Sequence, residues 1–177
     1  YFTSSRDNAK GTKNSPITGL RNNDTFFSKI NSSGVWESPQ AVMGEINTED
    51  DEGACCFSAD GKTMYFTRCR SIKGSTLGAE IYTCSRAGGE WSTPQLLILI
   101  NDSSVTVAHP AISPDNTYLY FVSDLKGGYG GKDLWRVKKT DTSGWGKPEN
   151  LGAGINTPGD EMFPYIKDDG TLYFSSN

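Results

Sequence analysis

Apolar and polar residues alternate over short stretches of this sequence, and turn residues separate the stretches. The segments FSADGKTMYF (57–66), ISPDNTYLYF (112–121) and IKDDGTLYF (166–174) each predict a strand, a tight turn and a second strand. The longest apolar run, LLILI at 96–100, has the length of a strand and not the roughly 18 residues of a membrane helix. No stretch has the pattern of a long helix. The pattern therefore predicts an all-β protein without direct membrane insertion.

Aromatic residues recur along the chain at a fixed interval. The pair Tyr-Phe begins at Tyr1, Tyr65, Tyr120 and Tyr173. Tryptophans recur every 54 or 55 residues, at Trp36, Trp91 and Trp145. The pair Ile-Asn recurs at the same interval, beginning at Ile46, Ile100 and Ile155. Three markers with one spacing indicate internal repeats of about 54 residues.

Each repeat has room for four strands. In the second repeat the pattern predicts strands at about 54–58, 63–69, 79–85 and 95–100. Four antiparallel strands per repeat are typical of a β-propeller blade, and propellers have four to eight blades. We therefore expect a partial propeller that belongs to a longer protein. Its expected units are a three-strand partial blade, two complete blades and a final hairpin, at 1–53, 54–106, 107–161 and 162–177.

The composition agrees with this architecture and narrows the class of partner. The 20 glycines, 8 tyrosines and 8 phenylalanines suit short strands joined by tight turns. The chain has 17 Lys and Arg against 21 Asp and Glu, which gives a net charge of −4. Because nucleic-acid binding depends on a basic surface, this balance disfavours a nucleic-acid partner.

The glycine-rich segment KGGYGGKDLW (126–135) resembles a phosphate-binding loop at first sight. A P-loop needs a Ser or Thr after its lysine and a helix after that, but Lys132 is followed by Asp133 and by a predicted strand. The segment also matches 71–82 of the preceding repeat, with Lys73 and Gly74 at the positions of the first lysine and glycine. We therefore predict a sharp turn in which the glycines permit positive φ and Gly128 and Gly130 place Tyr129 at the tip, and no cofactor.

The sequence contains little that could form a catalytic or metal site. His109 is the single histidine, and no G-x-S-x-G motif accompanies it, so a hydrogen-bonded structural histidine is the favoured interpretation. The four cysteines lack zinc-ligand spacing, and a disulfide stays open because sequence cannot choose among the pairings. These cysteines are Cys55, Cys56, Cys69 and Cys84, and the alignment of Cys84 with Val137 predicts a buried position for it. We expect no metal and no catalytic residue.

Two acidic segments, 49–52 and 160–161, fall in connections between consecutive repeats. Their carboxylates could bind calcium or, with Glu52 and Glu161 facing a channel, serve a glycosidase. The connection between them has Val105, Thr106 and Val107 instead. Solvated loop charges are the simpler interpretation and the one we favour.

The first repeat carries a longer loop than the others. The interval from Phe2 to Phe27 exceeds its counterparts by 9 to 11 residues, and the inserted segment is basic. Loops on a rigid propeller are common sites of binding, although a tolerated insertion is an open alternative. The candidate partner-binding residues are Arg6, Lys10, Lys13, Arg21 and Tyr129.

Three segments resemble a known family of repeats: SPDNTYLYFVSDLKGGYGGKDLW, GWGKPENLGAGINTPGDE and FPYIKDDGTLYFSSN. They are similar to the WD40-like repeats called PD40, which are also found in the TolB propeller. The glycine-rich loop and INTPGDE resemble propellers of OmpA-family envelope proteins of Bacteroidetes, including the PorE type associated with the type IX secretion system.

This resemblance implies a non-enzymatic scaffold that binds protein partners in the periplasm, in association with the outer membrane. Peptidoglycan binding would come only from a flanking domain. The alternative class is a propeller hydrolase, either a glycosidase or the accessory propeller of a peptidase.

Overall fold

The structure, a computed structural model, describes residues 1–10, 13–14, 19–72, 75–141 and 144–177. These residues form strands and no helix. The strands are β1 (Phe2–Ser4), β2 (Asp24–Phe27), β3 (Gln40–Ala41), β4 (Asp51–Phe57), β5 (Thr63–Ile72), β6 (Ser75–Ala87), β7 (Glu90–Trp91), β8 (Gln95–Leu96), β9 (Val107–Ile112), β10 (Tyr118–Ser123), β11 (Asp133–Lys138), β12 (Glu149–Asn150), β13 (Glu161–Ile166) and β14 (Leu172–Ser176).

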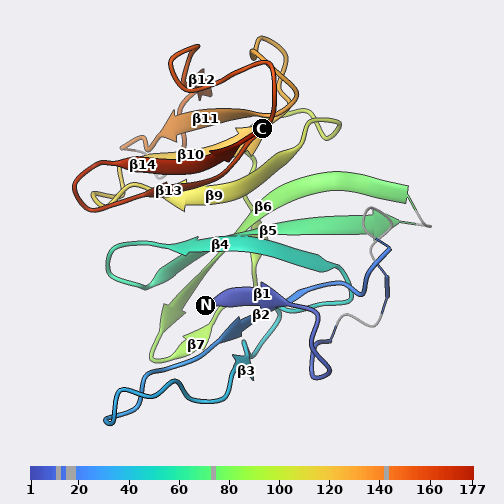
Figure 1. Ribbon diagram of the computed structural model, residues 1–177, viewed down its shortest axis with the longest axis vertical. Coiled ribbons are helices and arrows are strands. Elements are labelled where there is room, and N and C mark those ends of the chain that lie inside the picture. The colour runs from blue at the N-terminus through green and yellow to red at the C-terminus, as the bar shows by residue number, and fades with distance from the viewer. Residues whose placement is uncertain (11–12, 15–18, 73–74, 142–143) are drawn as a thin grey trace.

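The strands form a series of antiparallel sheets. The first sheet has the order β1-β2-β3, the second β4-β5-β6-β7 with β8 also paired to β6, and the third β9-β10-β11-β12. A final hairpin pairs β13 with β14. Figure 1 shows the three sheets stacked in chain order. The predicted all-β partial propeller is confirmed, and the unit boundaries drawn from the repeats stay a prediction.

The second sheet differs in detail from its predicted strands. Strand β6 has 13 residues and β5 has 10, so this hairpin extends beyond its counterpart in the third sheet, where both strands have 6. The outermost predicted strand, 95–100, shrinks to Gln95–Leu96. The chain leaves the sheet there because the following residues turn to cross toward β9.

The innermost strands β4, β9 and β13 share a bulge. Their registers shift at the same point, between Glu52 and Cys55 in β4 and beside His109 and Phe163 in the other two. His109 and Phe163 have φ of 49° and 55°, and each precedes a proline. A bulge accommodates a proline because the extra residue leaves the hydrogen-bond ladder.

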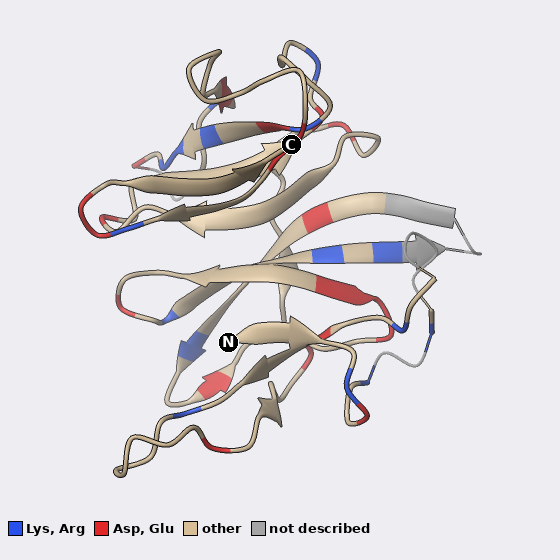
Figure 2. Cartoon of the chain, in the orientation of Figure 1, with Lys and Arg blue, Asp and Glu red and all other residues tan. Residues whose placement is uncertain are grey.

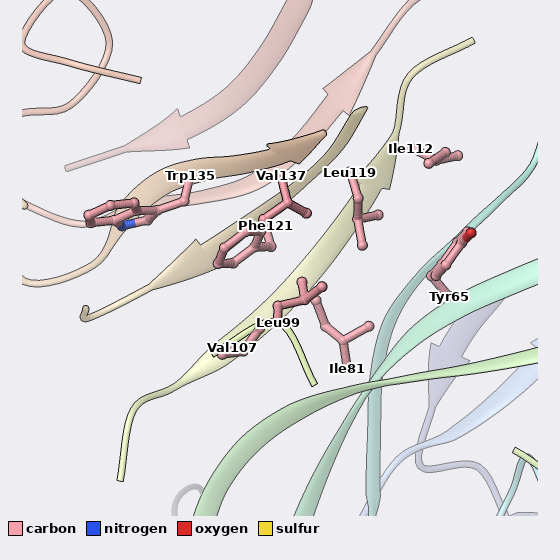
Figure 3. Close-up of a cluster of buried hydrophobic side chains, with 9 residues drawn as sticks. All are labelled: Tyr65, Ile81, Leu99, Val107, Ile112, Leu119, Phe121, Trp135 and Val137. Atoms are coloured by element: carbon pink, nitrogen blue, oxygen red, sulfur yellow. The ribbon is translucent and has the colours of Figure 1, made fainter. Parts of the chain in front are cut away.

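Two apolar clusters hold the sheets together. One lies between the first and second sheets and includes Ile46, Phe66 and Cys84, which confirms the predicted buried position of that cysteine. The larger lies between the second and third sheets (Figure 3). Its buried members are Tyr65, Ile81, Leu99, Val107, Ile112, Leu119, Phe121, Trp135 and Val137.

The strand register corrects the alignment of the first repeat. Phe2 pairs with Phe26, as Phe66 pairs with Tyr82. Phe26, rather than Phe27, is therefore the counterpart of Tyr82, and the insertion in the first loop is one residue shorter than the sequence suggested. Neighbouring aromatic residues left this choice open in the sequence.

Candidate interaction surface

The β1–β2 and β10–β11 loops meet the connections between consecutive sheets at one end of the molecule. We call these connections the first crossing (42–51), the second crossing (97–106) and the third crossing (151–160). The β10–β11 loop contacts the third crossing, since the Gly131 N–H donates to the Gly159 carbonyl at 3.0 Å. In the first sheet, Lys10 Nζ donates to the Gly44 carbonyl at 3.0 Å. These loops and crossings together form the loop face.

The first crossing is fixed by buried polar side chains. Asn47 accepts from the Thr25 N–H at 2.7 Å and donates to the Thr25 carbonyl at 2.9 Å, so its side-chain amide binds both backbone polar groups of Thr25. Thr48 Oγ1 donates to Glu52 at 2.8 Å. Asp51, the first residue of β4, accepts from the Asn23 N–H at 2.8 Å. The crossing is thereby pinned to β2.

The third crossing repeats this arrangement. Asn156 accepts from the Leu134 N–H at 2.8 Å and donates to the Leu134 carbonyl at 3.0 Å. Thr157 Oγ1 donates to Glu161 at 2.6 Å, and Asp160 accepts from the Lys132 N–H at 2.8 Å. The first and third crossings therefore use Asn, Thr, Asp and Glu in the same roles.

The second crossing has the same length but a different arrangement. The Leu97 N–H donates to the Ile81 carbonyl, as the Val42 N–H donates to the Thr25 carbonyl. Leu97 therefore corresponds to Val42, and counting forward from each aligns Asp102 with Asn47. The sequence had aligned Asn101 there, and the hydrogen bonds correct that by one residue. Asp102 is exposed and accepts from the Ser104 N–H at 3.0 Å and from its hydroxyl at 2.7 Å.

The glycine-rich loop is a turn that its own aspartate holds. Asp133 accepts from the N–H groups of Tyr129, at 2.6 Å, and Gly130, at 3.1 Å. A carboxylate of the chain thus takes donors that a phosphate would need. In the first sheet, Asp24 accepts from the Lys10 N–H in the same way.

Gly127 has the predicted role in that loop, whereas Gly128 and Gly130 are needed for another reason. Gly127 has a positive φ of 97°, but Gly128 and Gly130 do not. A Cβ on Gly130 would lie 2.2 Å from the Gly159 carbonyl oxygen, and one on Gly128 would lie 2.0 Å from the Asp133 carboxylate. They are needed because the loop packs closely on the third crossing and on Asp133. Lys73 and Gly74, matched to this loop by sequence, lie outside the described residues.

Glu52 is fully buried and paired, so solvated loop charge is the wrong interpretation for it. Arg68 Nε donates to it at 2.9 Å, and the same guanidinium donates to the Ile46 carbonyl at 2.8 Å. Burial raises the pKa of Glu52 to about 7, against the lowering effects of the Thr48 hydrogen bond and the Arg68 charge. Figure 2 shows basic positions on β5 between acidic positions on β4 and β6.

Glu161 is also fully buried, which again contradicts the solvated interpretation. Ser176 occupies the position of Arg68 and donates its hydroxyl to Glu161 at 2.8 Å. Burial acts to raise the pKa of Glu161, but hydrogen bonds from Thr157 and Ser176 outweigh it and the pKa lies below its ordinary value. Both carboxylates therefore serve as acceptors within the fold.

The predicted partner-binding residues lie in loops of the loop face, and some of them also hold their own loop. The Arg6 guanidinium lies over the rings of Phe2 and Phe26, 5.1 and 5.2 Å from their centroids. Arg21 donates to the Ala9 carbonyl at 3.0 Å. The side chains of Lys13 and Tyr129 are exposed, Tyr129 at 51%. Residues 11–12 and 15–18 of the basic loop lie outside the described residues.

His109 lies between the inner strands. Its ring stacks on that of Phe163, with centroids 4.0 Å apart, and its backbone N–H donates to Thr67 Oγ1 at 2.9 Å. Burial and then the charge of Lys132 lower the pKa of His109 to about 4. A neutral, stacked imidazole is consistent with the predicted structural role, but its Nδ1 is buried without a hydrogen-bond partner among the described residues, so the predicted hydrogen bonding is not found at that atom.

Cysteine and acidic side chains do not gather into a metal site in the part of the chain that the structure describes. The four cysteines are free, and burial raises the pKa of Cys55, Cys69 and Cys84 to about 11. They are packed thiols rather than nucleophiles. None of the described residues belongs to a helix long and apolar enough to span a membrane.

Solved structures support the fold class. No protein-family model and no curated protein matches the chain. A putative TolB from Agrobacterium tumefaciens is similar in structure, with 20% identity and a TM-score of 0.51 over 86% of this chain and 50% of that one. The chain thus has a TolB-like β-propeller fold.

Two further solved structures align with most of this chain at lower scores. TolB from Acinetobacter baumannii aligns with 92% of it, at 14% identity and a TM-score of 0.49. A prolyl endopeptidase structure aligns with 99%, at 15% identity and 0.46. The chain spans 34% and 26% of their respective lengths.

Sequence reasoning missed several polar residues that shape the loop face. Arg68 was read as part of a strand, and Asp24 and Asp133 were not singled out. The signal was present in the repeats, because Asp24 and Asp133 begin equivalent strands. Their importance depends on which loop donors they reach, which the repeats do not reveal.

Proposed function

We propose that this chain is a non-enzymatic protein-interaction module of the bacterial cell envelope, periplasmic and associated with the outer membrane. Its loop face would bind protein partners in a larger assembly such as the type IX secretion system. The TolB-like fold supports a propeller scaffold, and the sequence resemblance to OmpA-family envelope proteins supports the location and the assembly.

One observation carries the non-enzymatic proposal. Glu52 and Glu161, the two carboxylates best placed in sequence for hydrolysis, are fully buried and engaged by Arg68 and Ser176. A glycosidase needs one carboxyl group as an acid and another as a base or nucleophile at the substrate. These two groups instead support the crossings. The hydrolase alternative stays a prediction.

The experiment uses site-specific photocrosslinking in the full-length parent protein, within envelope preparations. A photoreactive residue replaces Lys13 or Tyr129, and a control replaces Lys139, an exposed residue at the opposite end of β11. We expect specific envelope proteins to be crosslinked from Lys13 and Tyr129 and not from Lys139. Charge reversal by Lys13→Glu should reduce capture at Tyr129 if both contact the same partner.

The opposite result would be equal capture from all three positions, or none. In that event, assays of glycan and peptide hydrolysis with Glu52→Gln and Glu161→Gln would test the alternative. Hydrolysis by the parent protein that both variants lose, while remaining folded, would establish the hydrolase.

A further inference from the structure

A pocket with a volume of about 510 Å³ opens between the first and second sheets. Its walls come from β2 and the residues after it, from the start of the first crossing, and from the β6–β7 hairpin. Figure 2 shows a basic position at the end of β6 and an acidic position on β7. Pockets for whole small molecules occupy about 300–1,000 Å³, so this one has room for such a ligand.

A glycine in the first crossing leaves this space open. Because Leu97 corresponds to Val42, Gly44 holds the position of Leu99 in the second crossing. Leu99 is buried in the larger apolar cluster. A Cβ on Gly44 would meet only the Trp91 carbonyl oxygen, at 3.9 Å. The first junction therefore has no side chain at the position where Leu99 packs in the second.

The aromatic and apolar wall of the pocket is accessible from solvent. Met43 is 81% exposed and Tyr1 is 47% exposed. Phe27 and Trp91 are half-buried, and the ring centroid of Phe27 lies 5.7 Å from that of Tyr1. Aromatic rings pack well on one another in offset and tilted arrangements, so this wall suits a ligand with a ring.

Two cations of the pocket have no carboxylate partner. The Arg86 guanidinium lies 4.7 Å from the centroid of the Trp91 ring, and only its Nε donates, to a backbone carbonyl at 3.0 Å. The Lys29 ammonium lies 5.8 Å from the centroid of the Phe27 ring. The ion pairs among the described residues include neither cation. Glu90 also lines the pocket, but it is exposed and pairs with neither of them.

We propose that this pocket binds a small carboxylate with an aromatic body. The ring of the ligand packs against Tyr1, Phe27 and Trp91, and its carboxylate accepts hydrogen bonds from Arg86 and Lys29. Hydrogen bonds between a guanidinium or ammonium and a carboxylate are stronger than neutral ones, so the two cations select an anion. The inference goes beyond the proposed function, because none of the predicted partner-binding residues lines this pocket.

The test is a methyl NMR titration of the full-length parent protein with labelled methionine methyl groups. The probes are 3-phenylpropionate, the neutral 3-phenylpropanamide, and propionate, which lacks the ring. We expect a saturable shift of the Met43 signal with 3-phenylpropionate, and at least tenfold weaker binding of the other two. Met162, on β13, lies outside the pocket and serves as the internal reference.

Matched variants test the two cations. Arg86→Met should weaken binding of 3-phenylpropionate about tenfold, and Lys29→Met, which removes a more exposed charge, about threefold. The control is Lys139→Met, because Lys139 pairs with Trp145 as Arg86 pairs with Trp91 but lies outside the pocket. This control should leave the affinity unchanged. An unchanged Met162 signal would show that each variant is folded.

The inference is overturned if 3-phenylpropionate does not saturate the Met43 signal, if the amide binds equally well, or if all three variants behave alike. Tighter binding of the peptide Ac-Ala-Ala-Phe, which has a free carboxylate, would assign the pocket to a protein C-terminus and overturn the small ligand. Crosslinking from Lys13 and Tyr129 tests the proposed function separately. Either proposal can therefore fail while the other stands.

Discussion

The first and third crossings are alike and the second differs, although all three span the same length. In the first and third, Asn47 and Asn156 bind a strand peptide while Glu52 and Glu161 are buried acceptors. In the second, the corresponding positions are Asp102 and Val107, and the crossing is held by apolar packing. Equal backbone length is therefore compatible with two ways of closing the same junction.

This difference teaches how a repeat protein can vary one junction without changing its fold. The sheets keep the strand register, because backbone hydrogen bonds set it, while side chains in the crossings are free to change. A polar crossing gives a fixed surface. An apolar crossing is held by side-chain packing instead, with Ile98 exposed at its surface.

The largest expected effect comes from breaking the ion pair of the first crossing. Arg68→Met leaves the Glu52 carboxylate buried without its cation, which should lower the free energy of unfolding by about 3–5 kcal/mol near pH 7.5. The double variant Arg68→Met/Glu52→Gln should recover part of the loss. Urea unfolding measures both. Additive losses in the double variant would show that the two groups do not act as a pair.

Removing the crossing amides should sharpen the comparison. Asn47→Ala and Asn156→Ala each leave a strand N–H without its side-chain acceptor and remove one of two donors to the carbonyl of the same residue, at a cost of about 2–4 kcal/mol. Asp102→Ala removes an exposed side chain and should cost less than about 1 kcal/mol. Urea unfolding of the three variants gives the ranking. A cost at Asp102 equal to that at Asn47 would contradict the distinction between crossings.

Adding a methyl group to the glycine-rich loop tests how tightly this loop packs on the third crossing. Gly130→Ala places a Cβ against the Gly159 carbonyl and should cost about 1–3 kcal/mol through overpacking. The matched control is Gly154→Ala in the same crossing, where a Cβ meets nothing within 4 Å. That control should change stability by less than about 0.5 kcal/mol. Thermal unfolding compares the two, and equal midpoints would mean that the loop moves aside.

The smallest effect concerns pH, because two buried groups act in opposite directions. The pKa of Glu52 is raised from 4.5 to about 7, so between these values the folded chain binds more protons and its stability falls as pH rises. The pKa of His109 is lowered from 6.5 to about 4, so between these values the unfolded chain binds more protons and stability rises with pH.

These opposing slopes should largely offset each other in the unmodified chain between about pH 4.5 and 6.5. Glu52→Gln should expose the His109 contribution, and the free energy of unfolding should then rise with pH. His109→Asn should expose the Glu52 contribution, with a falling free energy. Urea unfolding at several pH values checks both slopes, and the same slope in both variants would refute the assignment.

Among the candidate residues, sequence alone located Tyr129 in a turn and predicted the packed role of Cys84. Both follow from aligning repeats, since equivalent positions share backbone conformation and burial. The burial of Glu52 and Glu161 could not be predicted in this way. Acidic residues in a polar connection are usually solvated, and only their contacts with Arg68 and Ser176 explain the exception.

The sequence by itself determined the repeat, the alternation of strands and turns, and hence the all-β propeller class. Those features can be predicted from local periodicity and from turn residues, because both depend on residues that are neighbours in the chain. The tertiary structure decided the one-residue alignment at Asp102, the reason for Gly130 and the apolar packing of the second crossing. Each depends on contacts between segments far apart in sequence, where a shift of one residue changes which side chain faces inward.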